Sequence, residues 1–306
     1  MIERNLIIDA ISRHAPEDGT FECGLPGVTL IRWSRPILPM PVVYRPTMCI
    51  VAQGKKRAML GSEVFIYDQS RYLVASVDLP VMGSVIEASV EKPYLCLQVD
   101  LDIKVLAELS VEFAEKPSQG TASTAGLMLH ESDPGILHAA WRILSLLDKP
   151  DDIRALAPLA TREILYRLLT GPDSGPVRRL LNSGSRLKQI SRAIVWMREN
   201  FRENWSIEDA ADVANMSRSA FHSNFKAITL LSPLEFRTQL RLQEARRLML
   251  SEDLDAASAG FEVGYSSPSQ FSREYRRAFG VPPSKDKTEQ RYMHIPHFQV
   301  PSGASA

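Results

Sequence analysis

Short polar and cationic side chains recur in the same order at two places near the C-terminus. The segment Ser217–Lys226 (SRSAFHSNFK) returns 50 residues later as Ser267–Arg276 (SPSQFSREYR). Side chains of these types exchange hydrogen bonds with base edges, and cations also neutralise phosphates. The repeat therefore predicts two surfaces that contact the major groove of double-stranded DNA.

Helical spacing predicts which of these side chains face outward. Phe221 and Phe225 are one turn apart, as are Phe271 and Tyr275, and each pair is predicted to face the core. The positions between them are predicted to be exposed. They are Arg218, Ser219, His222 and Ser223 in the first copy, and Ser269, Gln270, Ser272, Arg273 and Arg277 in the second.

A short helix and a tight turn are predicted before each of these segments. Small residues ahead of each turn let two helices cross closely. Asn215 and Gly264 tolerate the left-handed backbone of such a turn, and Ser217 and Ser267 are suited to cap the helix that follows. Each copy is therefore predicted to be a helix-turn-helix.

The segment between the two copies is predicted to be one helix over residues 233–250. Its apolar residues are expected to face inward and its arginines outward; the inward set is Leu234, Leu240, Ala245, Leu248 and Met249. Eighteen residues span ~27 Å, close to the ~34 Å between major-groove faces on one side of B-DNA. One chain could thus present two recognition helices to adjacent grooves.

The duplicated region resembles a known family. Residues 186–285 are similar to the double helix-turn-helix domain of the AraC/XylS transcription regulators, above all at 264–277 (GYSSPSQFSREYRR) and 279–283 (FGVPP). The run 44–56 (YRPTMCIVAQGKK) resembles one N-terminal domain type of that family, a cupin-like barrel. The resemblance implies a sensory or dimerising barrel joined to a DNA-binding domain that regulates promoters.

The resemblance also implies roles for individual residues. The family positions that approach base edges correspond to Ser219, His222, Ser223, Ser269, Gln270, Ser272 and Arg273. Contacts with phosphates are assigned to Ser217, Arg218, Arg237, Ser267 and Arg277. The sequence departs from the family after the first recognition helix, where Leu230 replaces the usual glycine. Because Arg273 can pair with guanine through two hydrogen bonds, the second motif is predicted to read sequence more strongly.

The sequence predicts an α+β chain of two domains. Residues 1–171 are assigned to an antiparallel β-barrel, cupin-like, with a helical hairpin at about 134–170. Residues 172–184 are assigned to a linker, 185–285 to the all-α double helix-turn-helix domain, and 286–306 to a flexible tail.

Composition agrees with a two-domain globular chain. The chain has 306 residues, 44% of them hydrophobic and 24% charged, and no run approaches the ~20 apolar residues of a membrane helix. The net charge is zero, yet 19 basic and 22 acidic residues precede residue 182, whereas 15 basic and 12 acidic residues occupy 182–285. The basic excess favours phosphates only in the C-terminal part. A cytoplasmic protein without membrane contact is expected.

Nothing in the sequence predicts an enzyme, a cofactor or a metal site. The six histidines are His14, His130, His138, His222, His294 and His297, so none lies in the predicted strands at 27–102, where a metal-binding cupin needs its ligands. No phosphate loop or nucleophile triad is present. An effector, of unknown identity, would occupy the interior of the barrel.

Partners other than promoter DNA follow from the resemblance. They are a small-molecule effector, RNA polymerase and a second copy of the chain, with the hairpin at 134–170 as the dimer surface or, alternatively, packed on its own barrel. Two other functions stay open: an enzyme or thiol-based repair or sensor protein fused to a DNA-binding module, and an adaptor that has lost DNA affinity. Cys49 and Cys96, in apolar strands, are either inert or reactive thiols.

Overall fold

The computed structural model describes residues 2–113, 125–171, 174–181 and 185–286, and it divides into two units. The N-terminal unit consists mainly of residues 1–188 and contains every strand of the described residues. The C-terminal unit consists mainly of residues 189–300 and is helical where it is described. The predicted α+β class is therefore confirmed.

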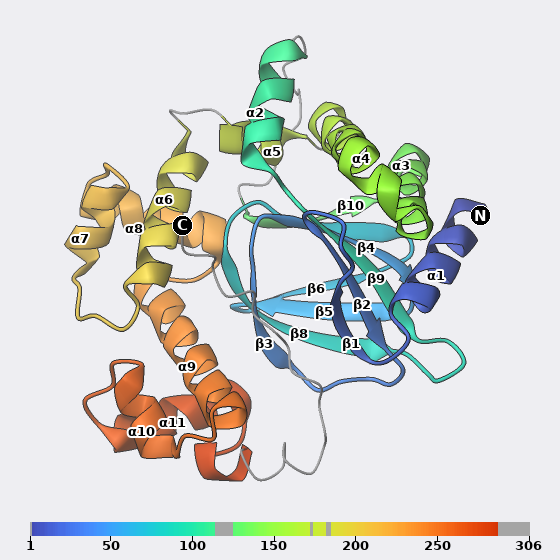
Figure 1. The fold of residues 1–306 in the computed structure, drawn as a ribbon. Helices are drawn as coiled ribbons and strands as arrows, with labels where there is room; N and C mark the ends of the chain where they lie inside the picture. Colours follow the sequence, from blue (N-terminus) through green and yellow to red (C-terminus); the bar gives the residue numbers. More distant parts are fainter. Residues whose placement is uncertain (1, 114–124, 172–173, 182–184, 287–306) are drawn as a thin grey trace. The chain divides into compact units, whose positions relative to one another are not determined.

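Ten strands of the N-terminal unit form two antiparallel sheets (Figure 1). The six-stranded sheet has the order β1-β2-β9-β4-β7-β10 and the four-stranded sheet the order β3-β8-β5-β6. Among the described residues no strand of one sheet pairs with a strand of the other. The structure therefore has two separate sheets where the sequence predicts a closed barrel. The strands are β1 (Gly19–Glu22), β2 (Val28–Trp33), β3 (Met40–Tyr44), β4 (Thr47–Gln53), β5 (Lys55–Leu60), β6 (Glu63–Asp68), β7 (Arg71–Ala75), β8 (Leu79–Glu87), β9 (Tyr94–Asp100) and β10 (Leu127–Glu131).

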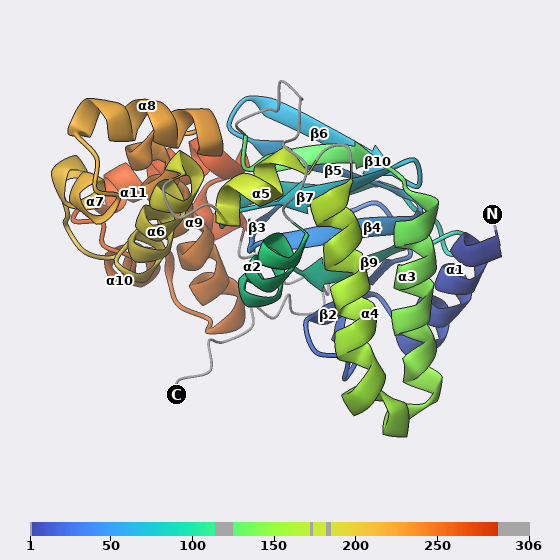
Figure 2. The same cartoon turned by 90° about the horizontal axis from the view of Figure 1, so that it is seen from above.

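Helices cover one face of the six-stranded sheet (Figure 2). They are α1 (Ile2–His14), α2 (Ile103–Glu112), α3 (Pro134–Ser145) and α4 (Pro150–Thr170), with a short 3₁₀ turn, η1 (Leu146–Asp148), between the last two. Along β4, Met48, Ile50 and Ala52 belong to the apolar core under these helices. Since side chains alternate along a strand, Cys49 and Val51 face the opposite side. Both are buried.

The helical hairpin α3–α4 forms where the sequence predicts it. The Asp133 carboxylate accepts a hydrogen bond from the Ile136 amide at 2.8 Å and caps α3, which begins with Pro134. The second helix ends at Thr170 before Gly171. The segment assigned to the linker contains a further short helix, α5 (Gly175–Leu181), whose Val177 lies in the N-terminal core.

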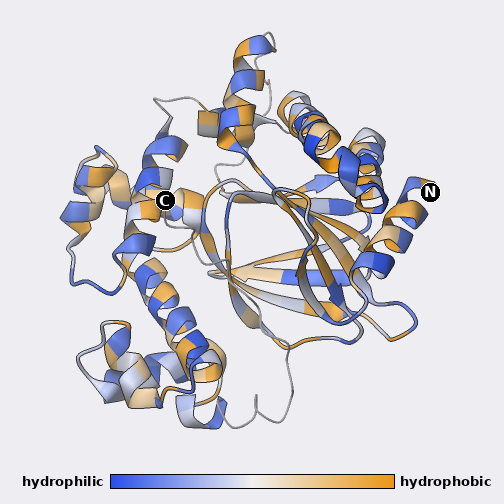
Figure 3. Ribbon diagram, in the orientation of Figure 1, coloured by the Kyte–Doolittle hydropathy of each residue, from blue (hydrophilic) through white to orange (hydrophobic). Residues whose placement is uncertain are grey.

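The C-terminal unit is built around one central helix. This helix, α9 (Pro233–Ser251), is preceded by α6 (Arg186–Glu199), α7 (Ile207–Val213) and α8 (Arg218–Thr229), and followed by α10 (Ala256–Glu262) and α11 (Pro268–Phe279). Orange apolar and blue polar turns alternate along α9 in Figure 3. Its inward face includes Phe236, which is buried, whereas Leu234, predicted to be inward, is exposed.

Candidate nucleic-acid interface

The first helix-turn-helix consists of α7, a turn at Asn215, and α8. A capping box between Ser206 and Asp209 starts α7, and Asn215 has a positive φ of 52°. The Ser217 hydroxyl accepts a hydrogen bond from the Ala220 amide at 3.4 Å. The predicted turn and cap are therefore confirmed.

The second helix-turn-helix repeats this construction in α10, a turn at Gly264, and α11. The Ser267 hydroxyl accepts from the Gln270 amide at 3.3 Å, and Gly280 ends α11 in the left-handed conformation. Gly264 has φ 92°, and a Cβ there would overlap the carbonyl oxygen of Arg202. Only glycine fits this turn, because the backbone of another loop passes directly over it.

Aromatic pairs hold both second helices against the core. The rings of Phe221 and Phe225 lie 5.3 Å apart, and those of Phe271 and Tyr275 lie 5.4 Å apart. All four side chains are fully buried. With one face of each helix fixed inward, the opposite face must meet solvent.

The side chains assigned to bases and phosphates lie on those outer faces. On α8 and just before it, Ser217, Arg218, Ser219, His222 and Ser223 are exposed. On α11, Ser269, Gln270, Ser272, Arg273 and Arg277 are exposed, and Ser267 is half-buried as the cap. Besides the two serine caps, Arg218 pairs with Glu208 at 2.7 Å, the Ser217 and Ser219 hydroxyls lie 3.5 Å apart, and Gln270 donates to Glu274 at 3.1 Å.

Arg237 is the one assigned residue that lies elsewhere. It is half-buried on α9, where its guanidinium donates to the Trp205 carbonyl oxygen at 3.0 Å and stacks 4.5 Å from the centre of the Trp205 rings. These contacts fix the loop before α7. They give Arg237 a structural role, and its assignment to a phosphate stays a prediction.

Arg241, one turn further along α9, connects the two motifs. Its guanidinium donates to the carbonyl oxygens of Phe201, Arg202 and Glu203 in the loop between α6 and α7, at 2.7, 3.1 and 3.0 Å. It also donates at 2.9 Å to the carbonyl oxygen of Gly264, in the turn of the second motif. A single side chain thus joins the approach to the first helix-turn-helix to the turn of the second.

Arg246 anchors the end of the second motif. The carboxylate of Asp286 accepts from Arg246 at 2.7 and 3.0 Å and from the Tyr275 hydroxyl at 2.6 Å. Asp286 is 3% exposed, although the sequence assigned it to the tail. Burial and the neighbouring Asp286 charge raise the pKa of Tyr275, which stays a hydrogen-bond donor.

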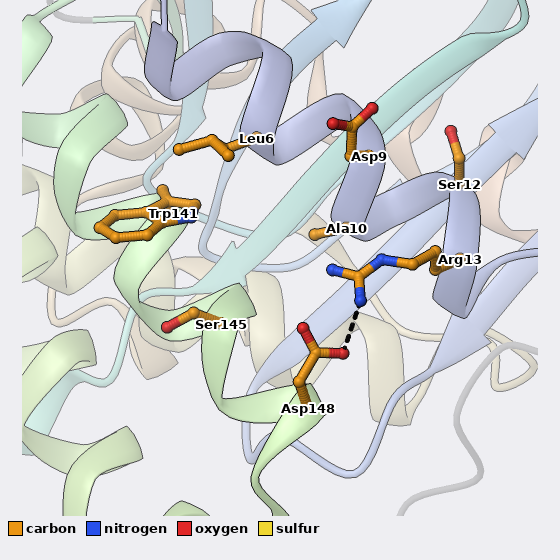
Figure 4. A pocket seen from close by; sticks show the side chains of 8 residues that line it. All are labelled: Leu6, Asp9, Ala10, Ser12, Arg13, Trp141, Ser145 and Asp148. Atoms are coloured by element: carbon orange, nitrogen blue, oxygen red, sulfur yellow. Dashed lines mark hydrogen bonds and ion pairs between the residues drawn. The ribbon is translucent and has the colours of Figure 1, made fainter.

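A surface pocket of about 480 Å³ lies in the N-terminal unit, between α1 and the α3–η1 segment (Figure 4). Leu6 and Trp141 form its apolar side, and Arg13 pairs with Asp148 at 2.9 Å across its polar side. Hydrogen bonds from Arg13 and His14 lower the pKa of Asp148. All of its lining residues lie on helices and none on a strand of the predicted barrel, in whose interior the sequence predicts an effector.

The described residues contain no group of three or more His, Cys, Asp or Glu side chains arranged to hold a metal ion. Nor does the described part of the chain include a helix of the length and apolarity needed to cross a bilayer.

Comparison with known proteins decides the family. Residues 24–175 match the AraC-type transcriptional regulator N-terminus, and residues 210–288 match a helix-turn-helix domain family. The chain belongs to the AraC family of transcriptional regulators. As expected of a family member, it is a DNA-binding transcriptional regulator in which a β-sheet domain precedes two helix-turn-helix motifs.

Relatives of this AraC-family chain extend over most of its length. It is 27% identical over 245 residues to the HTH-type transcriptional activator RhaS of Escherichia coli, covering 79% of this chain and 82% of RhaS. It is 23% identical over 261 residues to the virulence regulon transcriptional activator VirF of Yersinia enterocolitica, covering 83% and 93%. A crystal structure of an apo ToxT variant from Vibrio cholerae shares the fold, with a TM-score of 0.54 at 11% identity over 86% of this chain and 97% of ToxT.

Leu230 adopts the backbone that this AraC-family position demands. Its φ is +60°, so a leucine occupies the left-handed region at the end of α8. That conformation costs a residue with a Cβ roughly 1–2 kcal/mol. The leucine that replaces the usual glycine therefore keeps the same helix end, at the cost of strain in its backbone.

We expect Leu230→Gly to be more stable than Leu230→Ala by about 1 kcal/mol, because both lose the side chain and only glycine relieves the backbone strain. Urea unfolding of the two variants measures this difference. As a control, Asn215→Gly and Asn215→Ala should differ in the same direction, since Asn215 is also left-handed. Equal stability of the two Leu230 variants would mean that the loop relaxes to another conformation.

Proposed function

We propose that α8 and α11 are the recognition helices with which the chain reads promoter DNA. Ser219, His222 and Ser223 would face base edges from α8, and Ser269, Gln270, Ser272 and Arg273 from α11. The proposed phosphate contacts are those of Ser217, Arg218, Arg237, Ser267 and Arg277. The observation that carries the proposal is the division of both helices into a buried aromatic face and an exposed polar face.

The length of α9 supports the engagement of two grooves by one chain. Its 19 residues extend over ~28 Å, which approaches the ~34 Å between successive major-groove faces. A footprint on the promoter region next to the chain's own gene should therefore show two protected segments about one helical turn apart. This footprint also supplies the operator for the variants below.

Arg273→Ala should weaken binding to that operator by about 1–3 kcal/mol and relax the preference at one base pair, because a bidentate contact with guanine is lost. Gel-shift titrations on the operator and on its single-base variants measure both effects. Arg276→Ala, which removes an equal charge from another exposed position of the same helix, serves as the control. If Arg273→Ala weakens operator and random DNA equally, Arg273 contacts phosphate and not a base.

Salt dependence separates DNA binding from the role of a protein adaptor. For a regulator that neutralises phosphates, the logarithm of the binding constant falls linearly with the logarithm of the salt concentration, because cations of the salt compete for the phosphates. An adaptor would form no complex with the operator at any salt concentration. The same titrations, repeated over a range of salt, therefore test the proposed function itself.

The N-terminal unit is proposed to regulate this binding through a small molecule. ToxT structures contain an unsaturated fatty acid or (E)-4-(8-methylnaphthalen-1-yl)but-3-enoic acid, so organic acids are the first class to test. Such a molecule would shift regulation only if it binds one conformation of the chain better than another. We propose that the regulator acts in the cytoplasm, where promoter DNA is found.

Pairing of two chains and contact with RNA polymerase complete the proposal. The α4 helix exposes Leu156 and Leu159, which supports the hairpin as a dimer surface. RhaS and VirF are named as transcriptional activators, and activation by a DNA-bound protein is explained most simply by contact with the polymerase.

A further inference from the structure

A carboxylate on α11 joins the turn of the second motif to one of the side chains assigned to bases. Glu274 accepts a hydrogen bond from the Tyr265 hydroxyl at its Oε2, over 2.7 Å, and another from the Gln270 amide nitrogen at its Oε1, over 3.1 Å. Gln270 and Glu274 are one helical turn apart, so their side chains meet on the same side of α11. The exposed Gln270 is thus connected, through Glu274, to a residue outside its own helix.

The Tyr265 side chain is held in the core of the second motif. It follows Gly264 in the turn, is 6% exposed, and places the centre of its ring 5.3 Å from that of Phe271. The Arg241 guanidinium lies 5.8 Å from the centre of the same ring. Burial and the hydrogen bond to Glu274 raise the pKa of Tyr265, so its hydroxyl stays a donor. The carboxylate is therefore held by a residue that is itself fixed by packing.

The chemistry of the carboxylate decides which way the Gln270 amide turns. An ionised carboxylate only accepts hydrogen bonds, so the amide must present its NH₂ group to Glu274 and not its oxygen. This contact uses one N–H, and the amide oxygen and the second N–H stay available. A glutamine with these two groups available can form a bidentate pair with adenine, in which it accepts from N6 and donates to N7.

The side chains of the first motif cannot form an equivalent network. Fifty residues earlier, the corresponding positions are Asn215, Ala220 and Asn224. The alanine side chain has no hydrogen-bonding group, and the Asn224 amide donates instead to the Ala220 carbonyl oxygen at 2.7 Å. The network therefore belongs to the motif that the sequence predicts to read bases more strongly.

We propose that Tyr265 and Glu274 are positioning residues that hold the Gln270 amide in the orientation that pairs with adenine, so that α11 reads an A·T base pair with this side chain. The inference rests on the proposed function, in which α11 enters the major groove. An amide that is oriented before DNA binds loses less conformational entropy on binding. Because this gain applies only to the base that matches the amide, the network raises selectivity more than affinity.

Competition gel shifts of the full-length chain, with the footprinted operator and its single-base variants, test this proposal. Gln270→Ala should lower the preference for adenine at one base pair by about tenfold, because a bidentate contact is lost. Tyr265→Phe, which removes only the hydroxyl, and Glu274→Ala should each lower the same preference about threefold, because the Gln270 side chain is then free to rotate. In a chain that already carries Gln270→Ala, Glu274→Ala should change that preference no further.

Two control variants separate positioning from charge. Glu274→Gln removes the same charge as Glu274→Ala but keeps an oxygen that accepts from Gln270, so it should retain most of the preference for adenine. Asn224→Ala changes the corresponding residue of the first motif and should leave this base pair unaffected. Since both Glu274 variants lose a negative charge and should bind every duplex more tightly, the measured quantity is the ratio of affinities between bases.

The outcomes distinguish the positioning roles from the proposed function. Unchanged adenine preference in both Tyr265→Phe and Glu274→Ala would overturn the positioning roles while DNA reading by α11 still stands. They would also be overturned if Gln270 reads a base other than adenine, or if Glu274→Ala alters the preference at a different base pair. If Gln270→Ala changes no base preference, its assignment to a base fails and the positioning roles fail with it. Absence of any complex between the original chain and the operator would instead reject the proposed function.

Discussion

Asp286→Ala should lower the free energy of unfolding of the C-terminal unit by about 3–5 kcal/mol, because it leaves the buried Arg246 guanidinium without its counter-ion. The Tyr275 hydroxyl loses its acceptor in the same variant. Both orphaned groups lie in the core that holds α11 against α9. Amide hydrogen exchange in peptides from α9 and α11 measures the loss directly, since core amides exchange through opening of the unit.

Glu252→Ala provides the comparison for this variant. Glu252 also pairs with an arginine of α9, Arg247, at 2.9 Å, but that pair is partly exposed to solvent. Its removal should change the free energy of unfolding by no more than about 1 kcal/mol. If the two variants were equally stable, the Arg246–Asp286 pair would be solvated in solution and not the buried anchor described above.

Arg241→Met should reduce affinity for the two-motif operator by about 100-fold while leaving binding to a duplex with a single half-site little changed. The side chain joins the loop before α7 to the turn at Gly264, so its loss frees the two recognition helices to move independently. Two linked modules gain their combined affinity only when both can bind at once. Titrations on full-site and half-site duplexes measure the two effects separately.

Arg247→Met removes the same charge from the same helix and controls for general attraction to DNA. Its partners are the carboxylates of Glu244 and Glu252, so it donates neither to the backbone of the loop before α7 nor to the turn at Gly264. A loss of affinity shared by both variants, on both duplexes, would show that Arg241 contributes charge and not the relative placement of the motifs.

The sequence predicted the structure best in the two helix-turn-helix motifs, where the same pattern of residues occurs twice. Aromatic residues one turn apart predicted the buried faces of α8 and α11, and two serines predicted the caps, because these features depend only on local spacing. The left-handed turns at Asn215 and Gly264 follow from the same local chemistry. The antiparallel strands and the α3–α4 hairpin were likewise predictable, from the residue types of the strands and the turns between them and from the helical spacing of apolar residues.

The arginines of α9 show why contacts between residues that are distant in the sequence could not be predicted. Helical periodicity predicts that these arginines face solvent. Instead, Arg237 and Arg241 donate hydrogen bonds to backbone carbonyl oxygens, and Arg246 donates to a carboxylate. Those acceptors lie in loops or in a segment 40 residues away, and no helical pattern encodes them. The division of the strands into two sheets and the helix α5 depend on similarly distant contacts.

The position of Asp286 sets a lower limit on any autonomous DNA-reading fragment. A protein cut after residue 285 would retain both helix-turn-helix motifs in full and still lack the acid that neutralises Arg246. Such a truncation would be unstable for a reason that inspection of the motifs alone could not reveal. The minimal fragment must therefore continue at least one residue past the family-like segment.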